Sequence, residues 1–340
     1  MNDPDGEHFP WYPTEPAVRA ILHQHPAFDS PSIDLFCCGN TLFHLLAFAS
    51  NQERSFHFAV QRIGNTTFFN RKTIHIIDKI GSRGVGHSRS FIDQCTRWKA
   101  DVDGSDAHQR VIKFDFSGLS FVVRDNCDGY LDKNKKNNTD VDQNAEKPGK
   151  KDPIDISKDM SSLPLDDAPF AKLNIKSGGV TIPQADTLDI HTKSKHRKTP
   201  WKDCADDFLP RLWIRQTPRL VLAYRHYGRF YPNDTNIMNV KGSIKEWERN
   251  NATTLSKLAS VVRQLIGISK IEERSLFEVR RVKNGPLEIW SPGGDQPVLP
   301  EELVTRWKSG AVPCSENIKP EKEPTQVPTE PFWLDDEGYC

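Results

Sequence analysis

Two strand-like segments carry acidic residues out of apolar sequence, and they constrain the fold more than any other feature. The segment 121–130 (FVVRDNCDGY) runs from apolar residues to Asp128, and the segment 187–194 (TLDIHTKS) contains Asp189. Residues two positions apart share one face of a strand, so His191 and Lys193 lie on the face of Asp189. Two such strands side by side would hold both aspartates around one divalent cation.

The same residues also have a purely structural interpretation. Asp128 followed by Gly129 is typical of a turn, and Asp189 fits an edge-strand charge with a neighbouring partner. The basic run 193–198 (KSKHRK) fits a solvated loop as well as phosphate contact or nuclear import. Gln216 is either a polar residue at a helix end or a group that reaches the active centre. Residue types alone leave these alternatives open.

Composition excludes several function classes. Lys plus Arg and Asp plus Glu both number 46 in 340 residues, so no global charge indicates a nucleic-acid or membrane partner. The acidic, proline-broken amino terminus and the lack of about 18 consecutive apolar residues predict an intracellular protein, nuclear or cytoplasmic, without a membrane partner. Seven scattered cysteines without a CxxC pair indicate reduced thiols and give no zinc motif.

The chain divides by composition into three parts. Residues 1–32 are predicted to form a proline-rich, loosely attached arm, and residues 33–309 a single domain. Within that domain, residues 131–168 are rich in Lys, Asn and Asp, so we expect a disordered insertion. Residues 310–340 contain five prolines and no apolar period, which predicts a disordered tail.

Apolar periodicity predicts the main elements of the domain. Helices are expected at 40–50 and 206–215, and a longer helix opens with the capping box Ser243 to Glu246 and ends before Gly267. Hairpins are expected at 55–72, turning at Gly64, and at 110–125, turning at Ser117 and Gly118. A buried strand is expected at 219–225 and a last hairpin around Asn284 and Gly285.

Three groups of motifs, in this order, resemble the decapping nuclease family of the DXO type. The first is DLFCCGNTLFHLLAF with FHFAVQRIGNTTFF, the second GVGHSRSF with QRVIKFDFSGLSFVVRDNCDGY, and the third LDIHTKS with LWIRQTPRLVLAYRHYGRF. Together they span roughly residues 34–247. The resemblance implies an α/β (α+β) fold, with a mixed central β-sheet flanked by helices of the PD-(D/E)xK nuclease kind. It also implies Mg²⁺ or Mn²⁺ as cofactor and RNA 5′ ends as substrates.

The family's site residues are only partly present in this sequence. Its Glu-x-Asp pair falls on Asn126-Cys127-Asp128, and its Glu-x-Lys pair falls on Asp189-Ile190-His191. Phe91 stands where the resemblance places a Glu, and Cys38 where it places an Arg. Only Asp128 and Asp189 remain as metal-ligating acids, and losing a carboxylate weakens a Mg²⁺ site.

The chain also resembles fungal proteins labelled geranylgeranyl pyrophosphate synthetase. A prenyl synthase needs two Asp-rich helical motifs to bridge Mg²⁺ and diphosphate, and each Asp-Asp pair of this chain lacks the third acid. We therefore expect no isoprenoid diphosphate partner.

Two functions follow from the sequence. The first is a metal-dependent nuclease acting on RNA 5′ ends, in decapping or 5′-end quality control, with weakened activity. Its residues would be Asp128 and Asp189 as metal ligands, His191, Lys193 and Gln216 in catalysis, and Arg110, Lys195, Arg197 and Arg215 on RNA. The alternative is an inactive relative that keeps the groove and binds RNA or a protein partner.

Overall fold

The structure is a computed structural model that describes residues 12–71, 87–105, 107–132, 173, 175–271, 275–294 and 297–310. Two compact units divide the chain: residues 1–131 with 178–340, and residues 132–177. The predicted insertion at 131–168 and the predicted tail at 310–340 lie outside the described residues, apart from their first positions. All elements described below belong to the first unit.

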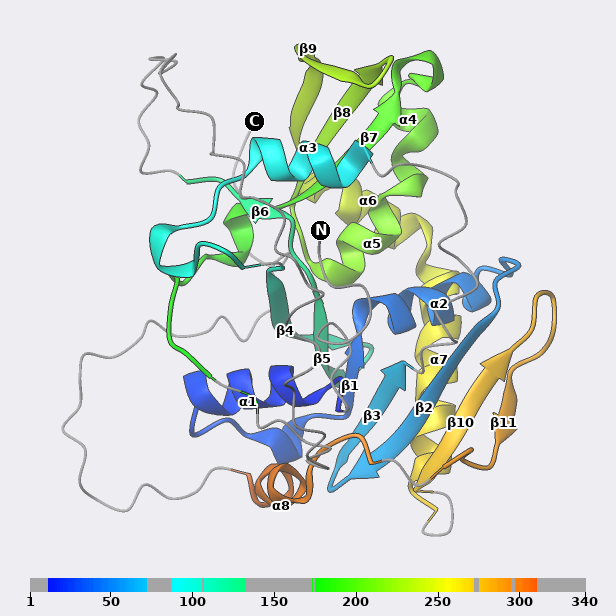
Figure 1. Cartoon of the computed structure of the whole chain (residues 1–340). Helices are drawn as coiled ribbons and strands as arrows, with labels where there is room; N and C mark the ends of the chain where they lie inside the picture. The colour runs from blue at the N-terminus through cyan, green and yellow to red at the C-terminus, as the bar shows by residue number, and fades with distance from the viewer. Residues whose placement is uncertain are drawn as a thin grey trace, which may run out of the picture. The chain divides into compact units, whose positions relative to one another are not determined.

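A seven-stranded mixed sheet is the larger of the two sheets in this unit (Figure 1). Its strands are β1 (Leu35–Cys38), β2 (Phe56–Ile63), β3 (Thr66–Arg71), β4 (Gln109–Phe116), β5 (Leu119–Asn126), β10 (Leu276–Arg281) and β11 (Glu288–Trp290). Their order is β11-β10-β2-β3-β1-β5-β4. Strand β1 runs parallel to β3 and β5, and the other pairs are antiparallel.

A second, four-stranded sheet contains β6 (Gly129–Tyr130), β7 (Thr187–Ser194), β8 (Arg219–His226) and β9 (Arg229–Asn239) in that order. Strand β7 is parallel to β8 and antiparallel to β6. The two acid-bearing segments therefore adjoin only in part, because β5 belongs to the larger sheet and only the short β6 pairs with β7. The predicted mixed α/β fold is confirmed, with its strands divided between two sheets.

The predicted hairpins are confirmed. Strands β2 and β3 are joined at Gly64 and Asn65, and β4 and β5 at Ser117 and Gly118. Both residues of the second turn have positive φ, 51° and 75°, which matches the right-handed twist of the strands they join. Strands β10 and β11 form the last predicted pair.

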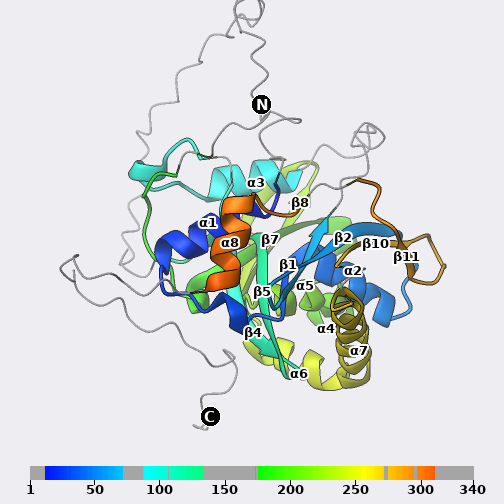
Figure 2. The same ribbon diagram turned by 90° about the horizontal axis from the view of Figure 1, so that it is seen from below.

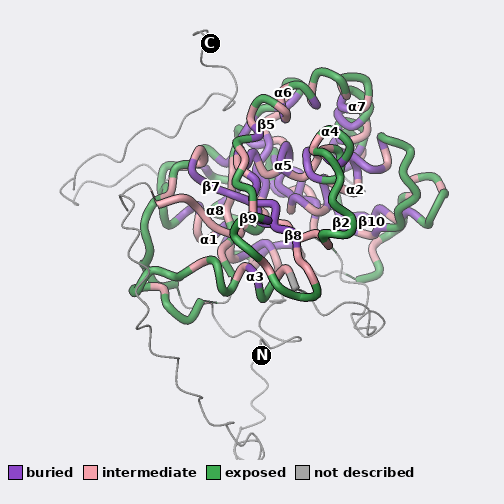
Figure 3. The backbone as a smooth tube through the Cα atoms, turned by 90° about the horizontal axis from the view of Figure 1, so that it is seen from above, coloured by how far each residue is buried: buried purple, intermediate pink, exposed green. Residues whose placement is uncertain are grey.

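The main core lies between helices and the larger sheet. The helices are α2 (Gly39–Ala49), α5 (Leu209–Arg215), α6 (Lys241–Asn250) and α7 (Ala252–Ser269). Helix α2 contributes Leu42 and Leu45 and α5 contributes Trp213, all at most 2% exposed, and they pack with Phe58 and Phe121 of the sheet. Figure 3 shows the buried segments of α5 and β7 in the interior. This packing fixes the end of α5, where Arg215 lies.

The longest helical region differs from its prediction. Helix α6 begins at Lys241, so Ser243 lies inside it, and the N–H of Lys241 donates to Oδ1 of Asn239 at 3.1 Å. The helix ends at Asn250, and α7 follows after Asn251. Gly267 lies within α7, which ends at Ser269. The capping-box interpretation is therefore wrong, because Ser243 does not precede the helix. The apolar stripe that predicted one helix belongs to two consecutive helices.

In place of a loosely attached arm, the described part of residues 1–32 contains helix α1 (Glu15–Gln24). Figure 2 shows α1 beside α8 (Glu301–Ser309). The apolar face of α1, with Val18 and Leu22, is buried in one cluster with residues of α8. Trp307 of α8 is 1% exposed and donates from Nε1 to Oγ1 of Thr66 at 2.9 Å. These two helices form a second core against the larger sheet.

Helix α3 (His87–Cys95) and the short α4 (Trp201–Cys204) complete the described helices. Phe91 of α3 packs against Phe230 at 4.5 Å between ring centroids, in a third apolar cluster with residues of β7 and β8. No helix of the described residues has both the length and the hydropathy that a membrane span requires.

Candidate functional site

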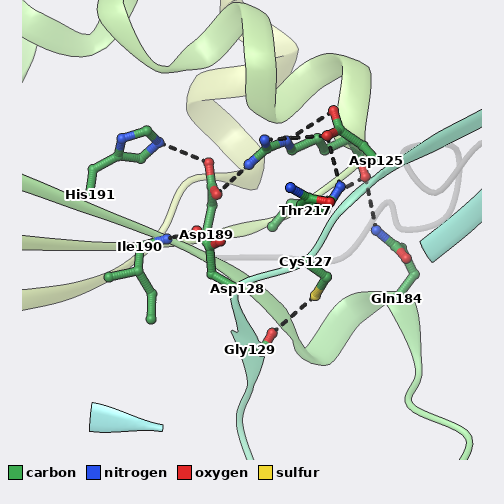
Figure 4. A network of polar contacts seen from close by, with 11 residues as sticks. Asp125, Cys127, Asp128, Gly129, Gln184, Asp189, Ile190, His191 and Thr217 are labelled. Atoms are coloured by element: carbon green, nitrogen blue, oxygen red, sulfur yellow. Dashed lines mark hydrogen bonds and ion pairs between the residues drawn. The ribbon is translucent and has the colours of Figure 1, made fainter. Parts of the chain in front are cut away.

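Four charged side chains from three segments meet where the two sheets adjoin. Asp125 is the penultimate residue of β5, and Asp128 lies between β5 and β6. Asp189 is the third residue of β7, and Arg215 is the last residue of α5. Figure 4 shows Asp128 beside Asp189, with the side chain of His191 directed toward Asp189.

The guanidinium group of Arg215 bridges two of the carboxylates. Its Nη1 donates to Oδ1 of Asp189 at 2.5 Å, and its Nε donates to Oδ2 of Asp125 at 3.1 Å. A longer bond of 3.4 Å joins Nη2 to Oδ1 of Asp125. Burial alone would lower the pKa of Arg215, but the charges of Asp189 and Asp125 outweigh burial and raise it. Arg215 is thus a permanent cation in the site.

Asp128 and Asp189 behave as a coupled pair. The backbone N–H of Ile190 donates to Oδ2 of Asp128 at 2.8 Å, and the two carboxyl groups share a hydrogen bond. Burial, then this bond and the charge of Asp189, raise the pKa of Asp128 to about 7. Burial would also raise the pKa of Asp189, but His191 and Arg215 outweigh burial and lower it. Below neutral pH the pair therefore holds one proton, on Asp128.

His191 and Lys193 share the strand face of Asp189, as predicted. The Nε2 atom of His191 lies 2.9 Å from Oδ2 of Asp189, and its ring packs 5.0 Å from Phe208. Lys193 instead donates to Asp207 at 2.8 Å and lies over the ring of Phe208. The structure therefore brings His191 to the aspartates, while Lys193 is paired with another acid.

The remaining predicted RNA-binding and catalytic residues lie outside this cluster. Arg110 donates to Oε1 of Gln184 at 3.0 Å and to the carbonyl of Ile182 at 2.9 Å. Lys195 pairs with Asp234 at 2.8 Å, and Arg197 is exposed. These contacts engage Arg110 and Lys195 within the protein.

Gln216 follows Arg215 in a left-handed conformation with φ of 50°. Its side chain is buried and donates to the carbonyl of Trp213 at 2.6 Å, so it closes the end of α5. The Nε2 of Gln184 bonds both the Arg215 and Gln216 carbonyls, at 3.0 and 2.9 Å. Gln216 thereby fixes the backbone that positions Arg215.

Two site residues escaped the sequence reasoning. Asp125 was overlooked because the resemblance directs attention to residues 126–128. Gly39, the first residue of α2, lies so close to Asp125 that an added Cβ would be 2.0 Å from Oδ2. The sequence does contain one signal for this contact, which is a glycine at the first position of a helix that follows a buried strand. Such a glycine indicates that another group closely approaches the backbone.

Solved structures with the same fold include those of Rai1. Rai1 of Scheffersomyces stipitis matches with a TM-score of 0.53 and 13% identity over 86% of this chain and 79% of that one. Rai1 of Candida albicans, in complex with pU5 and Mn²⁺, matches with a TM-score of 0.50 and 11% identity over 86% and 80%. The resemblance to decapping nucleases is therefore confirmed for the fold. No curated protein matches the chain.

A family model described as "Domain of unknown function (DUF8563)" matches residues 1–303. The chain belongs to the DUF8563 family. At the position where the resemblance expects a Glu, this DUF8563 chain carries Phe91, which is buried in an apolar cluster. The acid that the resemblance implies at this position is therefore absent, and a core residue stands there.

The DUF8563 site does not fit the divalent ion that the fold family implies. The Nη1 atom of Arg215 lies 2.5 Å from Oδ1 of Asp189, one of the two acids predicted to bind such an ion. Burial and Asp189 raise the pKa of Asp128 to about 7, so this carboxyl is only partly charged at neutral pH. Among the described residues, no group of three or more His, Cys, Asp or Glu side chains is placed to hold a metal. The guanidinium supplies the positive charge instead.

Proposed function

We propose that this DUF8563 chain binds the 5′ ends of RNA without hydrolysing them. The observation that carries the proposal is the position of Arg215, bridging Asp125 and Asp189. Metal-assisted hydrolysis needs an ion that lowers the pKa of a bound water and stabilises developing charge. A guanidinium binds anions but has no open coordination position for water.

The fold supports RNA as the ligand. The structures of the same fold include Candida albicans Rai1 in complex with pU5, a 5′-phosphorylated RNA, and this chain covers 80% of that protein. A chain that keeps this fold keeps the arrangement of its elements, while single residues such as Phe91 change the chemistry. We infer that this family member binds RNA but has lost the ability to hydrolyse it.

A second candidate is the metal-dependent nuclease predicted from the sequence. The convergence of Asp128, Asp189 and His191 favours it, because these residues were expected to meet. This function would require Arg215 to leave both carboxylates. The two candidates differ in one measurable outcome, which is loss of RNA in the presence of Mn²⁺ or Mg²⁺.

The test uses the full chain and single-stranded RNAs of one sequence with a 5′-monophosphate, a 5′-triphosphate, an unmethylated cap or a 5′-hydroxyl. Binding is measured by fluorescence anisotropy and RNA integrity by gel electrophoresis after incubation with Mn²⁺ or Mg²⁺. We expect salt-sensitive binding and RNA of unchanged length. Absence of binding to every RNA would overturn the proposal. Mn²⁺-dependent loss of RNA that Asp189→Ala abolishes would establish the second candidate instead.

A further inference from the structure

Two arginines lie over one aromatic ring beside the aspartate site, and the charge of a third, Arg71, acts on the neighbouring His44. Phe43 of α2 is half-buried, and the Cζ atom of Arg211, from α5, lies 4.1 Å from its ring centroid. The Cζ atom of Arg54, from the loop after α2, lies 5.0 Å from the same centroid. Arg71, at the end of β3, is exposed. We call Arg54, Arg71 and Arg211 the arginine cluster.

The arginine cluster has no paired acid of its own among the described residues, although the charges of Asp125 and Asp189 act on Arg211. None of its members forms an ion pair with a carboxylate of the described residues, and the Nε of Arg54 bonds only the amide oxygen of Gln52, at 3.3 Å. The lysines that the sequence offered for phosphate contact differ in this respect, because Lys193 and Lys195 each have an aspartate partner. Unmatched cations therefore lie on the Phe43 side of the site.

The pKa of His44 reflects its burial and the positive charge of the arginine cluster. Burial, followed by the charges of Arg71, Arg54 and Arg211, lowers the pKa of His44 to about 4, and no acid opposes them. Its Nε2 accepts from Asn40 at 3.4 Å, which places the ring proton on Nδ1. Nδ1 is buried and has no hydrogen-bond partner in the described part of the chain. The ring thus stays neutral beside three cations.

The arginine cluster and the aspartate site adjoin along helices α2 and α5. Gly39, at the start of α2, touches Asp125, and Phe43 lies one turn further along the same helix. Arg211 lies one turn before Arg215 in α5, and its pKa is lowered by burial and then by the charge of Arg215. A strand whose 5′ end reaches Arg215 would therefore pass the arginine cluster with its next phosphates.

We propose that the arginine cluster binds the backbone phosphates of single-stranded RNA next to its 5′ end. A guanidinium stacked on an aromatic ring keeps its N–H edge available, and that edge matches a phosphate with two parallel hydrogen bonds. Sequence-independent binding of single strands commonly combines such cations with aromatic rings. This inference rests on the proposed function, RNA binding, and assigns part of that binding to the arginine cluster.

The test compares two double variants that each remove two positive charges. Arg54→Gln/Arg71→Gln removes exposed members of the arginine cluster, and Lys257→Gln/Lys270→Gln, at two exposed lysines outside the predicted RNA-binding residues, is the matched control. Affinity for a 5′-monophosphorylated single-stranded RNA is measured by anisotropy over a series of KCl concentrations. Each lost phosphate contact reduces the slope of log K against log salt by about 0.7, so the cluster variant should lose about 1.4 and the control nothing.

Three outcomes separate the possibilities. A reduced slope only in the Arg54→Gln/Arg71→Gln variant supports the inference. An unchanged slope in that variant, while the wild type binds RNA, overturns the placement and leaves the proposed function standing. Wild type that binds no RNA overturns the proposed function itself. Because Arg54 and Arg71 are both exposed, thermal unfolding of the variant should match the wild type and exclude misfolding as the cause.

Discussion

The Nη1 atom of Arg215 donates to Oδ1 of Asp189 at 2.5 Å, and this bond joins the end of α5 to the middle of β7. The Asp189 side chain is only 2% exposed, so its carboxylate depends on protein groups for compensation. A buried charge that loses its partner costs far more free energy than the pair contributes while intact. Arg215 is therefore a stability determinant as well as the cation of the site.

Replacing Arg215 by methionine should lower the free energy of unfolding by about 3–5 kcal/mol at pH 7, because Asp189 would remain buried without its cation. Urea unfolding followed by circular dichroism measures the change. Arg211→Met is the matched control, since Arg211 lies in the same helix and forms no ion pair with a described carboxylate. The control should lose only about 1 kcal/mol. Equal losses in the two variants would contradict the role given to Arg215.

The same Arg215→Met variant should gain affinity for Mn²⁺. Without the guanidinium, the carboxylate of Asp189 would lose its competing cation beside Asp128, and carboxylate oxygens are ligands for such ions. At a free Mn²⁺ concentration about 100-fold above the dissociation constant, binding would stabilise the variant by about 2.7 kcal/mol. Thermal unfolding with and without Mn²⁺ checks this, and Arg215→Met/Asp189→Asn should lose the effect. Tight Mn²⁺ binding by the wild type would refute the interpretation of the site.

Stability should depend on pH through Asp128. Its pKa is raised from the ordinary aspartate value of 3.8 to about 7 by burial and by Asp189. Between these two values the native state holds a proton that the unfolded state has lost, so stability falls as pH rises, by about 1.4 kcal/mol per pH unit. Asp128→Asn removes this titration and keeps an acceptor for the Ile190 N–H.

The measurement is urea unfolding of the wild type and Asp128→Asn from pH 4 to pH 8. The stability of the wild type relative to the variant should be greatest near pH 4 and decline until about pH 7. A difference that stays constant across this range would show that Asp128 titrates as an ordinary exposed carboxyl.

Sequence reasoning reached the hairpins and two of the site acids because their signals are local. Period-two alternation in β2 and β5 and glycine at the turns determine these elements within about ten residues. His191 was found in the same way, from its spacing to Asp189. The bonds of Arg215 join residues 26 and 90 positions apart, and no local pattern encodes such pairing.

The division into two sheets escaped prediction for a related reason. Asp128 lies just beyond β5, and the chain then leaves the larger sheet to pair at Gly129 with β7. Alternation in β5 identifies a strand but not its neighbour. Helix α1 was missed because prolines obscure the apolar stripe of Val18 and Leu22, which is stabilised only by contact with distant α8. Tertiary packing, not propensity, decides such short helices.

Gly39→Ala should disturb the site, because the added Cβ would lie 2.0 Å from Oδ2 of Asp125, which Arg215 holds. The backbone at Gly39 is helical, so the obstacle is space and not conformation. Gly267→Ala in α7 is the matched control, since nothing lies within 4 Å of its added Cβ, and it should stabilise the protein by about 0.5–1 kcal/mol. We expect the Gly39 variant to lose about 1–3 kcal/mol in urea unfolding, as overpacked sites do. If both variants were stabilised equally, Asp125 would have to move at no cost, and its bond to Arg215 would not be a fixed part of the site.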